Sequence, residues 1–135
     1  MIDTVVSVEM LVEEVMRIKK NRLAPDACTG KEKRLCLASG SHGDELCGQF
    51  ICYEVIRKIK KDFQNLTGIV DVYPSMNPLG LDAQTRDFPL MDIDMNTIFP
   101  GDDDGAILEH AASRIIKDMA GADICLDIHS SNSLI

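Results

Sequence analysis

The sequence contains no tryptophan and few other aromatic residues, with four phenylalanines and two tyrosines among 135 residues. It also lacks any apolar run approaching the roughly 18 residues that a membrane-spanning helix requires. The first residues lack the basic region and the apolar core of a secretion signal. From these absences we expect a protein that neither enters nor crosses a membrane and that stays in the cytoplasm.

Basic residues are outnumbered, with 14 Lys and Arg against 22 Asp and Glu, which gives a formal net charge of −8. Binding to nucleic acid needs clustered Lys and Arg, so we expect no nucleic-acid partner. The chain also lacks a GxxxxGK[ST] loop, which argues against phosphate-based chemistry. Its length and its apolar content of 45% suit one globular domain over residues 1–135.

None of the five cysteines forms a CxxC pair. Together with the missing secretion signal, this favours a reducing compartment and free thiols. Four of the five lie in predicted strands or a predicted helix, where cysteine behaves as a small hydrophobic residue. A protein built on thiol or redox chemistry is therefore the weakest of the functional classes that we consider. The cysteines are Cys28, Cys36, Cys47, Cys52 and Cys125.

A helix is predicted over residues 8–22, where apolar residues recur at helical spacing and basic residues gather at the end. Ser7 is a plausible N-cap for it. Further helices are predicted over 46–63 and 106–120, and short apolar segments predict strands over 34–38, 68–74 and 122–128. A long polar segment, 75–105, is expected to be a functional loop.

This order of elements predicts an α/β domain with a mainly parallel sheet and helices on both of its faces. In such a fold the functional groups lie at the carboxyl ends of the strands. His42 and Glu45 lie in the turn between the first predicted strand and the helix that follows it.

Histidine nitrogen and carboxylate oxygen are both normal zinc ligands, and a catalytic zinc takes three protein ligands. His129, at the end of the last predicted strand, is the third candidate. We therefore predict one zinc ion per chain, bound by His42, Glu45 and His129. Asp127 should share a strand face with His129 and accept a hydrogen bond from His42 or His129. Alternatively, Asp127 merely caps the end of the strand.

Four segments, in this order, give the chain a family likeness. They are residues 40–45 (GSHGDE), 77–80 (NPLG), 94–96 (DMN) with 99–101 (FPG), and 127–129 (DIH). Together they resemble the succinylglutamate desuccinylase/aspartoacylase family, a branch of the zinc carboxypeptidase-like hydrolases. The resemblance implies a zinc-dependent hydrolase that cleaves a carbon–nitrogen amide bond with zinc-activated water. It also implies a small-molecule or short-peptide substrate, as for a deacylase of N-acyl amino acids or a carboxypeptidase.

The resemblance further assigns Arg86 to polarising the scissile carbonyl or binding a substrate carboxylate; the alternative is a surface arginine. Family members run on past the point where this sequence ends, and their general-base glutamate lies in that later part. We therefore expect this chain to be the amino-terminal portion of the catalytic domain, truncated at its C-terminus. On its own it should have little activity.

One departure from the family concerns the substrate. Where the family has Asp-Leu-Asn-Arg, this chain has Asp94, Met95, Asn96 and Thr97. The resemblance gives the asparagine and the arginine the task of holding a substrate carboxylate. Thr97 carries no charge, so neither N-acetylaspartate nor succinylglutamate follows as the substrate. A catalytically inactive module that keeps the fold and binds a small ligand is the alternative.

Overall fold

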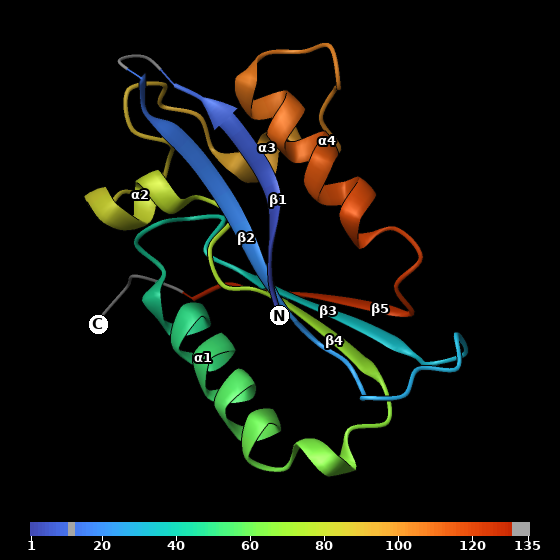
Figure 1. Ribbon diagram of the computed structural model, residues 1–135. Helices are drawn as coiled ribbons and strands as arrows, with labels where there is room; N and C mark the ends of the chain where they lie inside the picture. Colours follow the sequence, from blue (N-terminus) through green and yellow to red (C-terminus); the bar gives the residue numbers. More distant parts are fainter. Residues whose placement is uncertain (11–12, 131–135) are drawn as a thin grey trace.

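The computed structural model describes residues 1–10 and 13–130. Within these residues, five strands form one sheet with helices packed against it (Figure 1). The elements in chain order are β1 (Ile2–Glu9), β2 (Val15–Leu23), β3 (Arg34–Ser39), α1 (Leu46–Lys61), the short 3-10 helix η2 (Phe63–Asn65), β4 (Ile69–Tyr73), α2 (Pro78–Ala83), α3 (Met95–Ile98), α4 (Ile107–Met119) and β5 (Ile124–Ile128).

The strand order across the sheet is β1-β2-β4-β3-β5. β3 runs parallel to β4 and to β5, as the three predicted strands were expected to do. β2, however, runs antiparallel to both β4 and β1. The sheet is therefore mixed, and the expectation of a mainly parallel sheet is wrong.

The predicted helix over 8–22 is also wrong, because β1 and β2 form a hairpin there. Leu11 and Val12, which belonged to that prediction, lie outside the described residues. Ser7 is not an N-cap, since it pairs with Arg17 across the hairpin.

The burial of β2 alternates with the two-residue period of a strand. Met16, Ile18 and Lys20 all point inward, and the Lys20 ammonium bonds Asp118 at 2.8 and 2.7 Å. A charged residue at an inward position interrupts the apolar alternation, and this hid the strand in the sequence.

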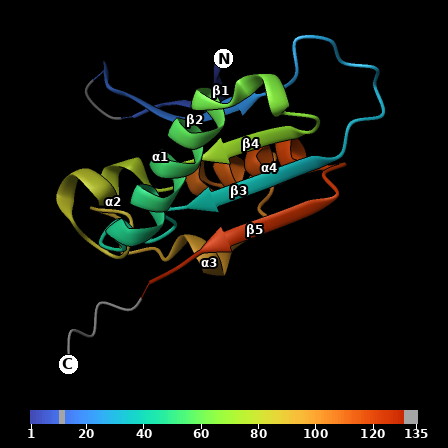
Figure 2. The same ribbon diagram turned by 90° about the horizontal axis from the view of Figure 1, so that it is seen from below.

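Helices cover both faces of the sheet, as predicted (Figure 2). On one face, α4 packs Leu108, Ala111 and Ile115 onto the larger hydrophobic core. On the other face, α1 places Cys52 against Leu37 and Val72. Both helices, and the strands β3, β4 and β5, fall where the sequence predicted them.

The segment 75–105 is not a structureless loop, because it contains α2 and α3. These helices are too short to show a helical period in the sequence. Each begins at a side-chain cap instead: Asn77 accepts from the Gly80 N–H, and Asp94 accepts from the Asn96 N–H. None of the helices in the described part of the chain combines the length and apolar character of a membrane-spanning segment.

Candidate metal centre

The carboxyl ends of β3 and β5 bring together two segments that lie far apart in the sequence. β3 pairs with β5 as far as Ser39 and Ile128. His42 and Glu45 follow β3 in the turn that leads into α1, and His129 follows β5. One ligand atom from each of these three side chains lies within 4.8 Å of the other two. The structure therefore brings together the three residues that the sequence put forward as metal ligands.

The two imidazoles turn the same ring nitrogen toward one carboxylate. His42 Nδ1 lies 2.7 Å from Glu45 Oε1, and His129 Nδ1 lies 3.0 Å from Glu45 Oε2. The ring centroids are 5.0 Å apart. Glu45 occupies the N-cap position of α1, yet its side chain makes no capping bond because it faces the histidines.

The outer nitrogen of each ring also meets a carboxylate. His42 Nε2 lies 3.1 Å from Asp94 Oδ1, and His129 Nε2 lies 3.0 Å from Asp127 Oδ2. An ionised carboxylate can only accept, so these two contacts favour the tautomer that carries the proton on Nε2. In the neutral ring this leaves the Nδ1 lone pair facing Glu45. Two acceptors at that distance require either a further proton or a cation between them.

Asp127 thus contacts His129, one of the two partners that the sequence allowed for it. The partner of His42 is Asp94, which sequence reasoning missed in this role. A signal was available, because two candidate metal-binding histidines each need an orienting partner and only one had been assigned. Asp94 lies in one of the four family segments and caps α3, which places it in an ordered turn.

The electrostatics of the cluster favour ionised carboxylates. Burial pushes the pKa of Glu45 upward, but the Ser130 N–H and the nearby His42 and His129 outweigh burial and lower it below its usual range. The pKa of Asp94 is lowered in the same way, against burial, by the Asn96 N–H and by His42. Burial alone would lower the pKa of His129, yet Asp127 and Glu45 raise it.

Arg86 lies at the rim of the cluster. Its Nη1 is 3.7 Å from Glu45 Oε1, its Nη2 is 3.2 Å from Asp94 Oδ2, and its side chain is 55% exposed. Its backbone carbonyl accepts from the Gly43 N–H at 3.3 Å and from Asn77 Nδ2 at 3.4 Å. Arg86 is therefore anchored through its backbone while its guanidinium reaches both the cluster and solvent.

Gly43 and Gly80 are needed for close approach rather than for a left-handed turn. A Cβ on Gly43 would lie 1.9 Å from the carbonyl carbon of Gly80, and a Cβ on Gly80 would lie 2.3 Å from Asn77 Nδ2. The turn that carries His42 thus packs directly on the backbone of α2. This contact explains physically why both segments belong to the site.

Asn96 and Thr97 are both exposed beside the cluster. Asn96 Nδ2 lies 3.1 Å from His42 Nε2. The Thr97 hydroxyl donates to the Asp94 carbonyl at 2.7 Å, so its proton is used within α3. Thr97 therefore brings neither charge nor an uncommitted donor to this part of the site.

Comparison with solved structures defines the class of protein. The chain superimposes on a metallo-carboxypeptidase from Burkholderia cenocepacia with a TM-score of 0.77 at 14% identity, covering 97% of this chain and 36% of that one. It also matches a succinylglutamate desuccinylase/aspartoacylase from Rhodobacter sphaeroides with a TM-score of 0.72 at 26% identity, covering 88% of this chain and 35% of that one. The chain therefore has the fold that these two structures share, a carboxypeptidase-like fold.

The sequence model of the succinylglutamate desuccinylase/aspartoacylase catalytic domain matches residues 31–134. The chain belongs to this family, and the resemblance drawn from the four segments is confirmed. A curated relative, the N-alpha-acetyl-L-2,4-diaminobutyric acid deacetylase of Halomonas elongata, is 31% identical over 104 residues. That match covers 75% of this chain and 29% of the relative, so the chain spans less than a third of the relative's length.

Proposed function

We propose that the protein is a zinc-dependent hydrolase of carbon–nitrogen amide bonds, a deacylase of N-acyl amino acids or a carboxypeptidase-like enzyme. In this proposal the chain supplies the zinc ligands His42, Glu45 and His129. One observation carries it: each imidazole has a carboxylate at both nitrogens, and the inner nitrogens share Glu45. A single divalent cation among the three ligands would satisfy every one of these groups.

The donor set fits zinc better than magnesium or calcium. Two imidazole nitrogens and one carboxylate are a usual catalytic zinc set, whereas magnesium and calcium prefer oxygen donors. The His129 side chain is 36% exposed, which leaves one side of the cluster open to a substrate and water. Zinc at this position would polarise a carbonyl and lower the pKa of water toward about 7.

The remaining side chains would orient the ligands and the substrate. Asp94 and Asp127 would hold the Nε2 protons and so keep the Nδ1 lone pairs turned inward. Arg86 would stabilise the negative charge that develops on the carbonyl oxygen, because its guanidinium is permanently charged and partly free at the rim. The general base would come from a later part of the whole protein.

Asn96 and Thr97 would face the rest of the substrate. Since Thr97 is uncharged and its hydroxyl is committed to Asp94, we propose that this position does not bind a substrate carboxylate. Thr97→Arg should improve activity on an N-acyl aspartate about tenfold, the order expected of one charge-assisted contact, with little change on the amide. No change on either substrate would contradict this account of the position.

Metal content and activity of the whole protein test the main proposal. We expect one zinc per chain in the parent and in His110→Ala, and none in His42→Ala. His110 is the matched control because it lies in α4 and donates to the Asp103 carbonyl, away from the cluster. Full zinc retention by His42→Ala would overturn the metal site. Bound zinc without turnover of any N-acyl amino acid would instead favour the inactive ligand-binding module.

We also propose a small-molecule or short-peptide substrate as the partner and a reducing cytoplasmic setting. The second point is supported by the cysteines, all five of which are free thiols. Expression of the whole protein with a carboxyl-terminal fluorescent tag, followed by cell fractionation, would test the location.

A further inference from the structure

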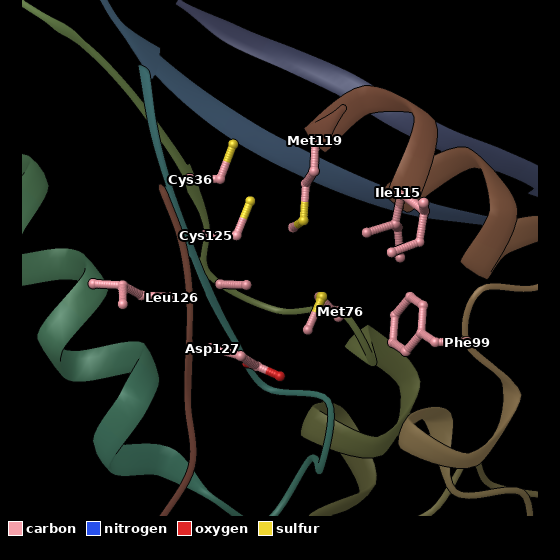
Figure 3. A pocket seen from close by; sticks show the side chains of 10 residues that line it. Cys36, Met76, Phe99, Ile115, Met119, Cys125, Leu126 and Asp127 are labelled. Atoms are coloured by element: carbon pink, nitrogen blue, oxygen red, sulfur yellow. The ribbon is translucent and has the colours of Figure 1, made fainter. Parts of the chain in front are cut away.

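A second cluster of metal-binding atoms lies away from the histidines, in a cavity of about 190 Å³ between the sheet and α4. Four sulfur-bearing side chains line it, from three strands or strand ends and one helix. Figure 3 shows their sulfur atoms directed into the same space. They are Cys36 on β3, Cys125 on β5, Met76 just after β4, and Met119 at the end of α4.

The two cysteines are direct neighbours in the sheet. Cys36 and Cys125 are register partners in the parallel pairing of β3 with β5, and both side chains point to the α4 side (Figure 3). Register partners of a parallel pair lie on neighbouring strands about 4.8 Å apart and point to the same face of the sheet, so the two thiols are adjacent along one wall of the cavity.

We propose that Cys36 and Cys125 form a binding site for one thiophilic metal ion of the Cu(I) type. Thiolates and thioethers are soft ligands that select Cu(I) over harder ions. Met76 and Met119 would add soft thioether contacts beside the two thiolates. This site is separate from the histidine cluster and takes a different class of metal.

The surroundings exclude competing hard ligands. Ala38, Phe99 and Ile115 supply apolar walls. The only carboxylate at the cavity is Asp127, as far as the described residues show, and its Oδ2 already lies 3.0 Å from His129 Nε2. The Tyr73 hydroxyl lies 4.0 Å from Cys36 Sγ and donates to Asp118, so the oxygen atoms near the two thiols are already engaged elsewhere.

Burial and protonation differ between the two thiols. Cys36 is fully buried, whereas Cys125 is exposed among the described residues, on the outer strand β5. Burial raises the pKa of the Cys36 thiol, and the charge of Arg34 opposes this in part. On binding, each thiol loses its proton to solvent as its metal–sulfur bond forms, with no change in the oxidation state of metal or sulfur.

The test measures Cu(I) affinity of the whole protein without oxygen, by competition with a chromophoric Cu(I) chelator and with zinc at saturation. We expect the parent to bind one Cu(I) per chain. Cys125→Ser should bind Cu(I) at least about 100-fold more weakly, because the loss of even an outer partner of a ligand lowers metal affinity about 10- to 100-fold. Cys47→Ser is the matched control, because Cys47 is also exposed but lies on α1. It should bind Cu(I) like the parent.

X-ray absorption at the copper edge gives a second readout, which needs no variant, and the proposal expects only sulfur neighbours around the copper. In the chelator competition, Met119→Leu should weaken Cu(I) binding less than Cys125→Ser does. Equal affinity of Cys125→Ser and the parent would overturn the site. A copper shell of nitrogen and oxygen atoms would overturn it as well, because it would place the ion in the histidine cluster.

Discussion

The molecule buries two carboxylates in two different ways. Asp71 in β4 is fully buried, and its Oδ2 accepts from Arg22 at 3.0 Å and from Arg34 at 2.8 Å. Glu45 is 5% exposed, and its oxygens face the imidazoles of His42 and His129. Nitrogen atoms surround both carboxylates, but only some of these nitrogens can offer a lone pair to a proton or a metal ion.

The difference lies in the lone pairs. Arginine and lysine side chains are donors with no acceptor, so the Asp71 network has no place for a metal ion. Imidazole can offer a lone pair once its other nitrogen keeps the proton, as Asp94 and Asp127 require here. A buried carboxylate among permanent cations therefore stabilises the fold, whereas one among histidines forms a site whose occupant can change.

The largest effect should come from breaking the Asp71 network. Asp71→Asn should lower the free energy of unfolding by about 3 kcal/mol, the lower end of the range for breaking a buried pair, because it removes the buried charge that pairs with the partly exposed Arg22 and Arg34. Urea unfolding of the zinc-loaded protein measures this, while zinc content should stay at one per chain. Glu54→Gln breaks an exposed pair with Arg57 and should cost less than about 1 kcal/mol. Equal costs for the two variants would refute the structural role of Asp71.

The converse change is Glu45→Gln. It removes one proposed zinc ligand, so zinc affinity should fall by more than about 100-fold, beyond what the loss of an outer partner costs. Competition with a zinc chelator measures the affinity. Unfolding of the metal-free variant should differ from the parent by less than Asp71→Asn does, because glutamine leaves neutral imidazoles rather than arginines unpaired. Unchanged zinc affinity would contradict our ligand assignment.

Smaller effects should come from the outer carboxylates. Asp94→Asn and Asp127→Asn should each weaken zinc binding about 10- to 100-fold, since they no longer fix the Nε2 proton of their histidine. Asp123→Asn is the control, because Asp123 bonds Lys33 and the Arg34 N–H outside the site. If Asp127 only capped its strand, Asp127→Asn would change stability and leave zinc affinity as in the parent.

The smallest effects concern pH, and they should have opposite signs in the two regions. Burial acts to raise the pKa of Asp118, but Lys20 and the Tyr73 hydroxyl outweigh burial. The folded pKa of Asp118 therefore lies below its unfolded value. Its contribution to stability is present above about pH 4 and is lost as the pH falls through the folded pKa. Asp118→Asn should therefore approach the parent in stability at acid pH.

For His129 the folded pKa is raised, by Asp127 and Glu45 against burial. In the metal-free protein the contribution of His129 to stability is present below its unfolded pKa of about 6.5. That contribution is lost as the pH rises through the folded pKa. His129→Gln should thus be less stable than the parent at pH 5, and the gap should narrow at pH 8. A gap that widens toward pH 8 would mean that His129 is not charged in the metal-free cluster.

Patterns close together in the sequence predicted much of this protein. The apolar runs of β3, β4 and β5 and the periodic helices α1 and α4 could be assigned because each shows its own local period. The ligand candidates His42, Glu45 and His129 could also be named, since a strand followed by a turn places such residues at one edge of a sheet. The four segments were sufficient to identify the family.

Other features depended on which residues meet across the fold. Lys20 reads as a surface residue until Asp118, from the far end of the chain, pairs with it, and so the hairpin of β1 and β2 was mistaken for a helix. Whether Asp94 or Asp127 orients His42 depended on where α3 begins relative to the turn after β3. The pairing of Cys36 with Cys125 depended on strand register, which local periodicity does not specify. Sequence alone therefore determined the donor types and the elements with a clear local period, and only the tertiary structure decided the partners, because partners are set by contacts between distant parts of the chain.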